Sequence, residues 1–185
     1  MIDIDQFQRR VSHVARGCPT AVLRDAILQA AEDFCERTWL WKDYLTLEAV
    51  EGQVEYALQP PRSADILAVA EVAVDGVRAE FTTPDRATIR FWAAPQAGLE
   101  IKALAVLKPS RTAKTLPDFL WDEWQDAIAA GARYKLLDMA GSDWFSPQLS
   151  DKYRLEFERL WVPRARVETA HRQGRPLSVQ KRRFV

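Results

Sequence analysis

The segment Val-Ala-Val-Asp-Gly-Val-Arg-Ala at residues 72–79 decides the fold class of this 185-residue chain. Short alternating stretches lie on both sides of Asp75-Gly76, and this pair supplies the two positive-φ positions of a type I′ turn. The segment therefore predicts a β-hairpin in the middle of the sequence.

Strand-like patterns extend outward from this hairpin over residues 43–108. Leu45, Leu47 and Ala49 alternate with polar residues, and a second alternation covers residues 54–58. Turn signals at 60–61, 84–85 and 95–98 divide the rest of the region. About five or six short strands with tight turns predict a small antiparallel sheet or sandwich.

Helical spacing of apolar residues predicts four helices around this β-region, two on each side. The expected ranges are 3–16 and 19–39 before the β-region, and 117–140 and 147–174 after it. The pattern predicts an α+β fold: a four-helix bundle with a small antiparallel β-insertion between helices 2 and 3, and an extended C-terminal tail.

The expected domain organisation follows from these elements. We assign the helical bundle to residues 1–42 and 109–176, the inserted β-region to 43–108, and an extended docking tail to 177–185. Where bundle and β-region meet, we expect the side chains of Trp39, Trp41, Trp121 and Trp124, most simply as core residues.

Charge is unevenly distributed along the chain, although the formal net charge is zero. Residues 164–185 hold seven Lys or Arg residues against one acid, Glu168, which gives this end a net charge of +6. Residues 1–163 therefore carry −6. A basic end on an acidic body indicates a partner outside the chain's own fold.

The last nine residues predict a partner-binding segment. Extended, they reach roughly 30 Å, enough to lie on another chain and add a strand to its sheet. The expected partner-binding residues are Leu177, Val179, Lys181, Arg182, Arg183, Phe184 and Val185. The same charge also suits phosphate neutralisation on nucleic acid. This alternative stays open, although the sequence has no helix-turn-helix, zinc-finger or RNP-type signature.

The sequence offers little for metal or cofactor chemistry. His13, His171, Cys18 and Cys35 lack the short-range pairing of a structural zinc site. We expect both cysteines to be free thiols in a reducing compartment. We expect no bound cofactor, no metal and no membrane insertion, since no apolar run reaches the roughly 20 residues that a membrane span requires.

An acidic group near the start of the third expected helix is the one arrangement that suggests catalysis. Asp122 and Asp126 share a helical face beside Glu123, which leaves a small hydrolase or nuclease open. Acids at a helix start are commonly explained by the helix dipole, and no nucleophile or basic companion motif accompanies them. We therefore expect a protein that is not an enzyme.

Five segments spread over nearly the whole chain form a combination of structural rather than catalytic motifs. They are Gly17–Pro19, Phe34–Thr38, Leu116–Ile128, Trp144–Leu149 and Arg182–Phe184. In these segments the chain resembles the head-to-tail adaptor (connector) proteins of tailed bacteriophages.

The resemblance implies a virion structural protein at the head-to-tail interface, assembled in the host cytoplasm. Such adaptors form a twelve-membered ring beneath the portal protein and continue the channel through which DNA passes without specific binding. By the same resemblance, residues 177–185 grip the portal, and the β-region faces the downstream tail or nozzle protein. No motif for channel-lining residues is matched in this sequence.

Overall fold

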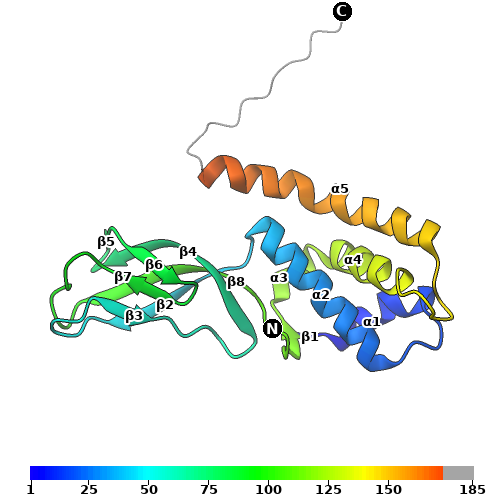
Figure 1. The fold of residues 1–185 in the computed structure, drawn as a ribbon, viewed down its shortest axis with the longest axis horizontal. Helices are drawn as coiled ribbons and strands as arrows, with labels where there is room; N and C mark the ends of the chain where they lie inside the picture. Colours follow the sequence, from blue (N-terminus) through cyan, green and yellow to red (C-terminus); the bar gives the residue numbers. More distant parts are fainter. Residues whose placement is uncertain (173–185) are drawn as a thin grey trace, which may run out of the picture.

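The computed structural model describes the backbone of residues 1–172 and side chains up to residue 165. Helices lie at one end of the long axis of the molecule and most strands at the other (Figure 1). The helices are α1 (Asp5–Val11), the 3-10 turn η1 (Ser12–Val14), α2 (Thr20–Thr38), α3 (Asp118–Asp122), α4 (Gln125–Leu137) and α5 (Pro147–Arg172). The strands are β1 (Ile2–Asp3), β2 (Lys42–Glu48), β3 (Glu55–Ala57), β4 (Ala64–Val74), β5 (Val77–Arg78), β6 (Thr82–Asp85), β7 (Thr88–Arg90), β8 (Glu100–Pro109) and β9 (Thr115–Leu116).

The helices α2, α4 and α5 pack closely because small residues line their contact. Gly131 of α4 is buried, and a Cβ added to it would lie 2.9 Å from the Cβ of Ala30 on α2 and 3.2 Å from the ring of Phe157 on α5. A side chain at position 131 would therefore collide with Ala30 and Phe157. Glycine therefore sets the distance between α2 and α4.

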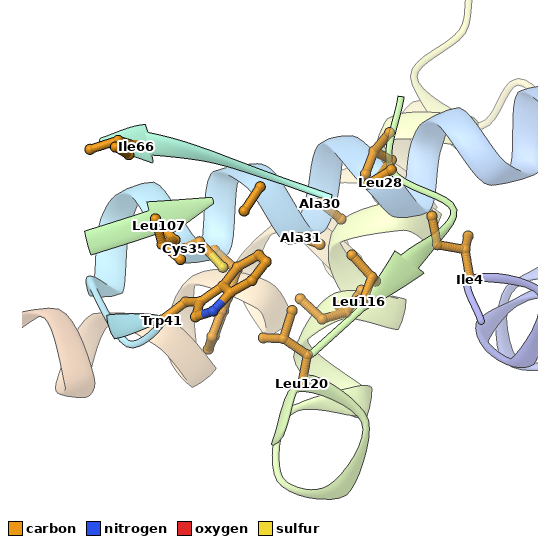
Figure 2. Close-up of a cluster of buried hydrophobic side chains, with 14 of the residues drawn as sticks. Ile4, Leu28, Ala30, Ala31, Cys35, Trp41, Ile66, Leu107, Leu116 and Leu120 are labelled. Atoms are coloured by element: carbon orange, nitrogen blue, oxygen red, sulfur yellow. The ribbon is translucent and has the colours of Figure 1, made fainter. Parts of the chain in front are cut away.

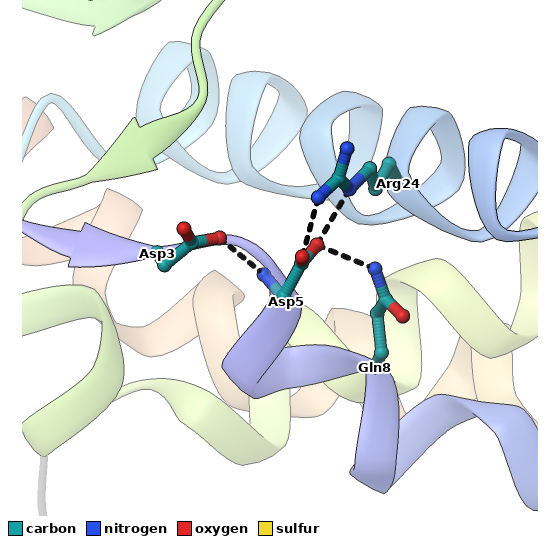
Figure 3. Close-up of polar contacts among 4 residues, drawn as sticks. All are labelled: Asp3, Asp5, Gln8 and Arg24. Atoms are coloured by element: carbon teal, nitrogen blue, oxygen red, sulfur yellow. Dashed lines mark hydrogen bonds and ion pairs between the residues drawn. The ribbon is translucent and has the colours of Figure 1, made fainter.

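An aspartate network ties α1 to α2 (Figure 3). The guanidinium of Arg24 donates from Nε to Oδ1 of Asp5 at 2.5 Å and also pairs with Oδ2, while Gln8 Nε2 donates to Asp5 Oδ1 at 2.6 Å. Asp3 accepts the backbone N–H of Asp5 at 2.9 Å. The hydrogen bond from Arg24 holds the pKa of Asp5 below its ordinary value.

Residues 42–109 form what we call the β-lobe, which contains two antiparallel sheets. Their strand orders are β2-β8-β4-β5 and β3-β7-β6. The hairpin between β4 and β5 is confirmed, because Asp75 and Gly76 both have positive φ, at 49° and 77°. Buried side chains of both sheets, among them Ile89 and Ile101, belong to the same hydrophobic cluster.

This hydrophobic cluster continues from the β-lobe into the helices (Figure 2). Trp41 and Leu107, at the base of β2 and near the end of β8, lie with Cys35 of α2, while Leu116 and Leu120 close the cluster from β9 and α3. Burial raises the pKa of the Cys35 thiol. The cysteine is therefore a core residue.

Two further aromatic contacts connect the α3–α4 region to α1 and α2. Trp121 packs edge to face on Phe7 of α1, with ring centroids 5.0 Å apart, and Trp124 packs on Phe34 of α2 at 5.1 Å. On one continuous helix, residues three apart would share a face. The chain turns at Glu123–Trp124, so the two tryptophans reach different helices.

The expected four-helix bundle with one small β-insertion is wrong. The described residues instead form a mixed α+β fold with five α-helices and three antiparallel sheets. The expected helix over 117–140 is divided into α3 and α4. The expected helix over 3–16 begins only at Asp5, because Ile2–Asp3 pairs with Thr115–Leu116 as a third sheet.

Two further expectations concern the organisation of the chain. The division into a bundle of residues 1–42 and 109–176 and an inserted region of 43–108 stays a prediction. Within residues 1–172, no helix combines the length and the apolar character that crossing a membrane requires.

Candidate partner-binding surfaces

The partner-binding residues expected from the sequence lie outside the described part of the chain. They are Leu177, Val179, Lys181, Arg182, Arg183, Phe184 and Val185. The structure instead shows α5, the helix that leads toward them along one side of the helical part (Figure 1).

The first half of α5 is firmly attached to the helices beneath it. Ser150 Oγ donates a hydrogen bond to the carbonyl oxygen of Tyr134 at 3.0 Å, and the rings of Phe157 and Tyr134 lie 6.1 Å apart. One turn further, the guanidinium of Arg37 lies 4.8 Å from the centre of the Trp161 ring. These contacts fix the direction of the helix.

The second half of α5 is less covered. None of the side chains from Glu158 to Ala165 is buried, and the helix continues through Pro163. Pro163 is exposed, so water can hydrogen-bond the carbonyl group that its missing N–H leaves without a helical partner. The helix thus extends past its packing contacts before the basic residues at the C-terminal end of the sequence.

A second surface lies on the β-lobe, beside the connection between β5 and β6. Trp92 is 79% exposed there, and Val77 is 71% exposed. A groove of about 580 Å³ runs past Trp92 and is lined by Arg78, Ala79, Glu80, Phe81 and Thr82 as well. A tryptophan this exposed is typical of a protein interaction surface.

Sequence reasoning missed Trp92, although the sequence contained a signal for it. Phe91 and Trp92 are adjacent, and in an extended segment neighbouring side chains point to opposite faces. Only one of the two can then face the core. The structure buries Phe91, which lies 5.9 Å from the ring of Tyr56, and leaves Trp92 in solvent.

The β-lobe also carries half of the negative charge of the body. Residues 42–109 contain ten acids and seven bases, a net charge of −3. Two of the bases are neutralised locally, because Arg90 pairs with Glu55 and Lys102 pairs with Glu100 at 2.8 Å. The exposed apolar side chains of the lobe therefore stand in an acidic environment.

The acidic group on α3 and α4 does not form a metal site. Asp126 is 2.8 Å from Nη1 of Arg10, in an exposed ion pair. Within the described residues, no three His, Cys, Asp or Glu side chains lie close enough together to hold a metal ion. Asp126 lies in the first turn of α4, where the helix dipole favours an acid, and it joins α4 to α1, whereas Asp122 is the last residue of α3.

The comparisons with known proteins give a limited result. No protein-family model matches the chain, and no curated protein matches it. Among solved structures, a chain from the neck of an empty GTA (gene transfer agent) particle is similar at 22% sequence identity, over 81% of this chain and 87% of that chain, with a TM-score of 0.26. A superposition this loose assigns neither a family nor a role to this chain.

Proposed function

We propose that this chain is a structural protein of the neck of a tailed-phage-like virion, without enzymatic activity. In this proposal it acts as a head-to-tail adaptor: twelve copies form a ring beneath the portal protein, and the ring continues the DNA channel toward the tail or nozzle protein. The sequence resemblance described above suggests this role.

The observation that carries the proposal is the combination of α5 with the charge that follows it. Residues 173–185 contain Arg175, Lys181, Arg182 and Arg183 and no acid. They follow a helix whose last described side chains are not buried. A basic segment presented at the end of such a helix suits docking on an acidic surface of another protein.

The charge of the remaining chain supports the same role. Residues 1–163 carry −6, and the β-lobe contributes half of it. Like charge disfavours adhesion of DNA to a wall that it must pass. An acidic body with a basic end is therefore suited to a connector that holds a protein partner and releases DNA.

The test is binding to portal particles of the same virus. A full-length variant with Lys181, Arg182 and Arg183 changed to Gln should fold as the wild type and lose portal binding by about tenfold or more. The matched control is Arg86→Gln, at an exposed position of the β-lobe. Portal binding by the triple variant equal to that of the wild type would contradict the assignment of the C-terminal segment.

A nucleic-acid-binding module is the second candidate, because residues 164–185 carry a net charge of +6. Duplex DNA titrated at two salt concentrations separates the two functions. A protein that neutralises several phosphates loses affinity steeply as salt rises, with a log–log slope of roughly −0.9 per phosphate contacted. The adaptor role predicts weak binding with a slope near zero.

A further inference from the structure

The outer face of α5 carries a regular set of side chains, exposed except for the half-buried Val162, which we call the α5 ridge. Its members are spaced by four and three residues and lie on the side of the helix away from the buried residues Ser150 and Phe157. They are Gln148, Lys152, Leu155, Arg159 and Val162. Leu155 is 62% exposed, and Arg159 forms no ion pair with any described residue. The ridge is therefore basic and apolar, with no acid in it.

A groove follows the exposed face of α2, which we call the α2 groove. It consists of two adjoining cavities of about 340 and 370 Å³ that share Asp25, Leu28 and Arg111. Asp25, Gln29 and Glu32 stand along its α2 wall, and Leu28, which is buried, lies between them. Arg111 and Lys114 stand on the other wall, on the connection between β8 and β9.

Two acids of this groove, Asp25 and Glu32, lack ion-pair partners within the described chain. Asp25 is exposed and forms no ion pair there, and Oε1 of Glu32 is buried without a hydrogen-bond partner. Burial raises the pKa of Glu32, against the opposing influence of Lys108 and Arg111. Lys108 is already engaged by Glu36 at 2.7 Å. A carboxylate in this position gains from a cation brought by another molecule.

The spacing of the ridge matches the spacing of the groove. Lys152 and Arg159 are seven residues apart on α5, and Asp25 and Glu32 are seven residues apart on α2. At 1.5 Å per residue, both pairs are separated by about 10.5 Å along their helices. Leu155 lies between the two cations, and Leu28 lies between the two acids.

We propose that the α5 ridge of one copy lies in the α2 groove of a second copy of this chain. Lys152 and Arg159 then pair with Asp25 and Glu32, and Leu155 packs against Leu28. Because the ridge and the groove belong to different helices of one chain, one neighbouring copy binds the ridge and another binds the groove. Such a contact joins unlike surfaces and generates a closed ring or an open chain of subunits rather than a closed dimer.

This inference deepens the proposed adaptor function and rests on it for the biological setting of the ring. Its test does not depend on the portal or on the C-terminal segment. Failure of self-association would overturn the ridge contact alone, whereas failure of portal binding would overturn the adaptor assignment.

Sedimentation velocity measures self-association of the full-length chain at protein concentrations up to about 0.5 mM. The measurement is made at low and at high ionic strength, because salt screens the attraction between charges. The wild type should associate reversibly, and less at high salt. The ridge variant Lys152→Glu with Arg159→Glu should raise the dissociation constant at least about tenfold, as should the groove variant Asp25→Lys with Glu32→Gln. A chain that combines only Lys152→Glu and Asp25→Lys should associate to within about threefold of the wild type, because this reversed pair again carries opposite charges.

Two controls keep the result interpretable. Arg86→Glu reverses one exposed charge on the β-lobe and should leave association unchanged, and thermal melting should show that each variant is folded.

As a second readout, Leu155→Cys and Gln29→Cys in a Cys18→Ser chain should form a disulfide between copies. A chain that stays monomeric and gives no such disulfide would overturn the proposal. So would charge variants whose effects simply add when combined.

Discussion

Replacing Gly131 by alanine should destabilise the protein, although alanine is the better helix former. Helix propensity alone favours Gly→Ala by about 1 kcal/mol. The new Cβ would lie 2.9 Å from the Cβ of Ala30 and 3.2 Å from the ring of Phe157. The Ala30 Cβ is fixed to the backbone of α2, so the contact is relieved only if α2 and α4 move apart.

The size of the effect follows from these opposing contributions. Forcing a methyl group into a packed helix contact costs about 1–3 kcal/mol, and the backbone-fixed neighbour places this case near the upper limit. The net loss of unfolding free energy should be about 2 kcal/mol, which lowers the Tm of a protein of this size by roughly 4–8 °C. Urea unfolding and thermal melting both measure it.

A double-mutant cycle identifies the contact responsible. Ala30→Gly removes the methyl group that the new side chain meets, so Gly131→Ala with Ala30→Gly should lose less stability than the sum of the single variants. The reasoning is refuted if Gly131→Ala raises the stability by the propensity difference of about 1 kcal/mol. It is also refuted if the two substitutions are additive.

Three further substitutions test the remaining features. Arg133→Ala should lower the free energy of unfolding by about 1–3 kcal/mol, because Arg133 donates two hydrogen bonds to the carbonyl oxygen of Arg10, at 2.6 and 3.1 Å. Urea unfolding measures this loss, with Arg133→Lys as the partial control. Burial raises the pKa of Glu32 in the folded state above its ordinary value of 4.5. Between the unfolded and the folded pKa, the folded state binds more protons than the unfolded state, so stability falls as pH rises through this range. Glu32→Gln should flatten this slope and leave stability at pH 7 unchanged or higher, which unfolding at several pH values measures. Trp92→Ala should change the unfolding free energy by no more than about 0.5 kcal/mol, because the side chain is 79% exposed; a larger loss would show that it supports the fold.

Features that depend on local chemistry could be predicted from the sequence. The hairpin at Asp75-Gly76 is one, since turn type depends on which residues tolerate positive φ. The helix Thr20–Thr38 is another, since its apolar spacing marks the buried face. Both signals lie within a few residues of the structure that they specify.

Features that depend on distant partners could not be predicted in this way. The pairing of Ile2–Asp3 with Thr115–Leu116 joins segments far apart in the chain, and neither segment alone shows a strand pattern. The turn at Glu123–Trp124 exists because Trp121 and Trp124 pack on different helices. Apolar spacing alone does not reveal such a turn and predicts one continuous helix.

The candidate surfaces also differ in whether the sequence alone could predict them. The basic C-terminal segment is evident from charge alone, whereas the match between α5 and α2 is not. Lys152, Leu155 and Arg159 read as an ordinary exposed helix face until the structure shows a groove whose α2 wall carries Asp25 and Glu32 at the same spacing. The spacing of these charges indicates a contact only when the positions of both helices are known.

Imaging of the virion with this chain labelled tests the central claim most directly. The adaptor assignment predicts a ring of this chain between portal and tail, with residues 177–185 in contact with portal subunits and α5 of each copy beside α2 of the next. Localisation of the chain to the capsid shell or the distal tail, or its absence from mature particles, would contradict the assignment.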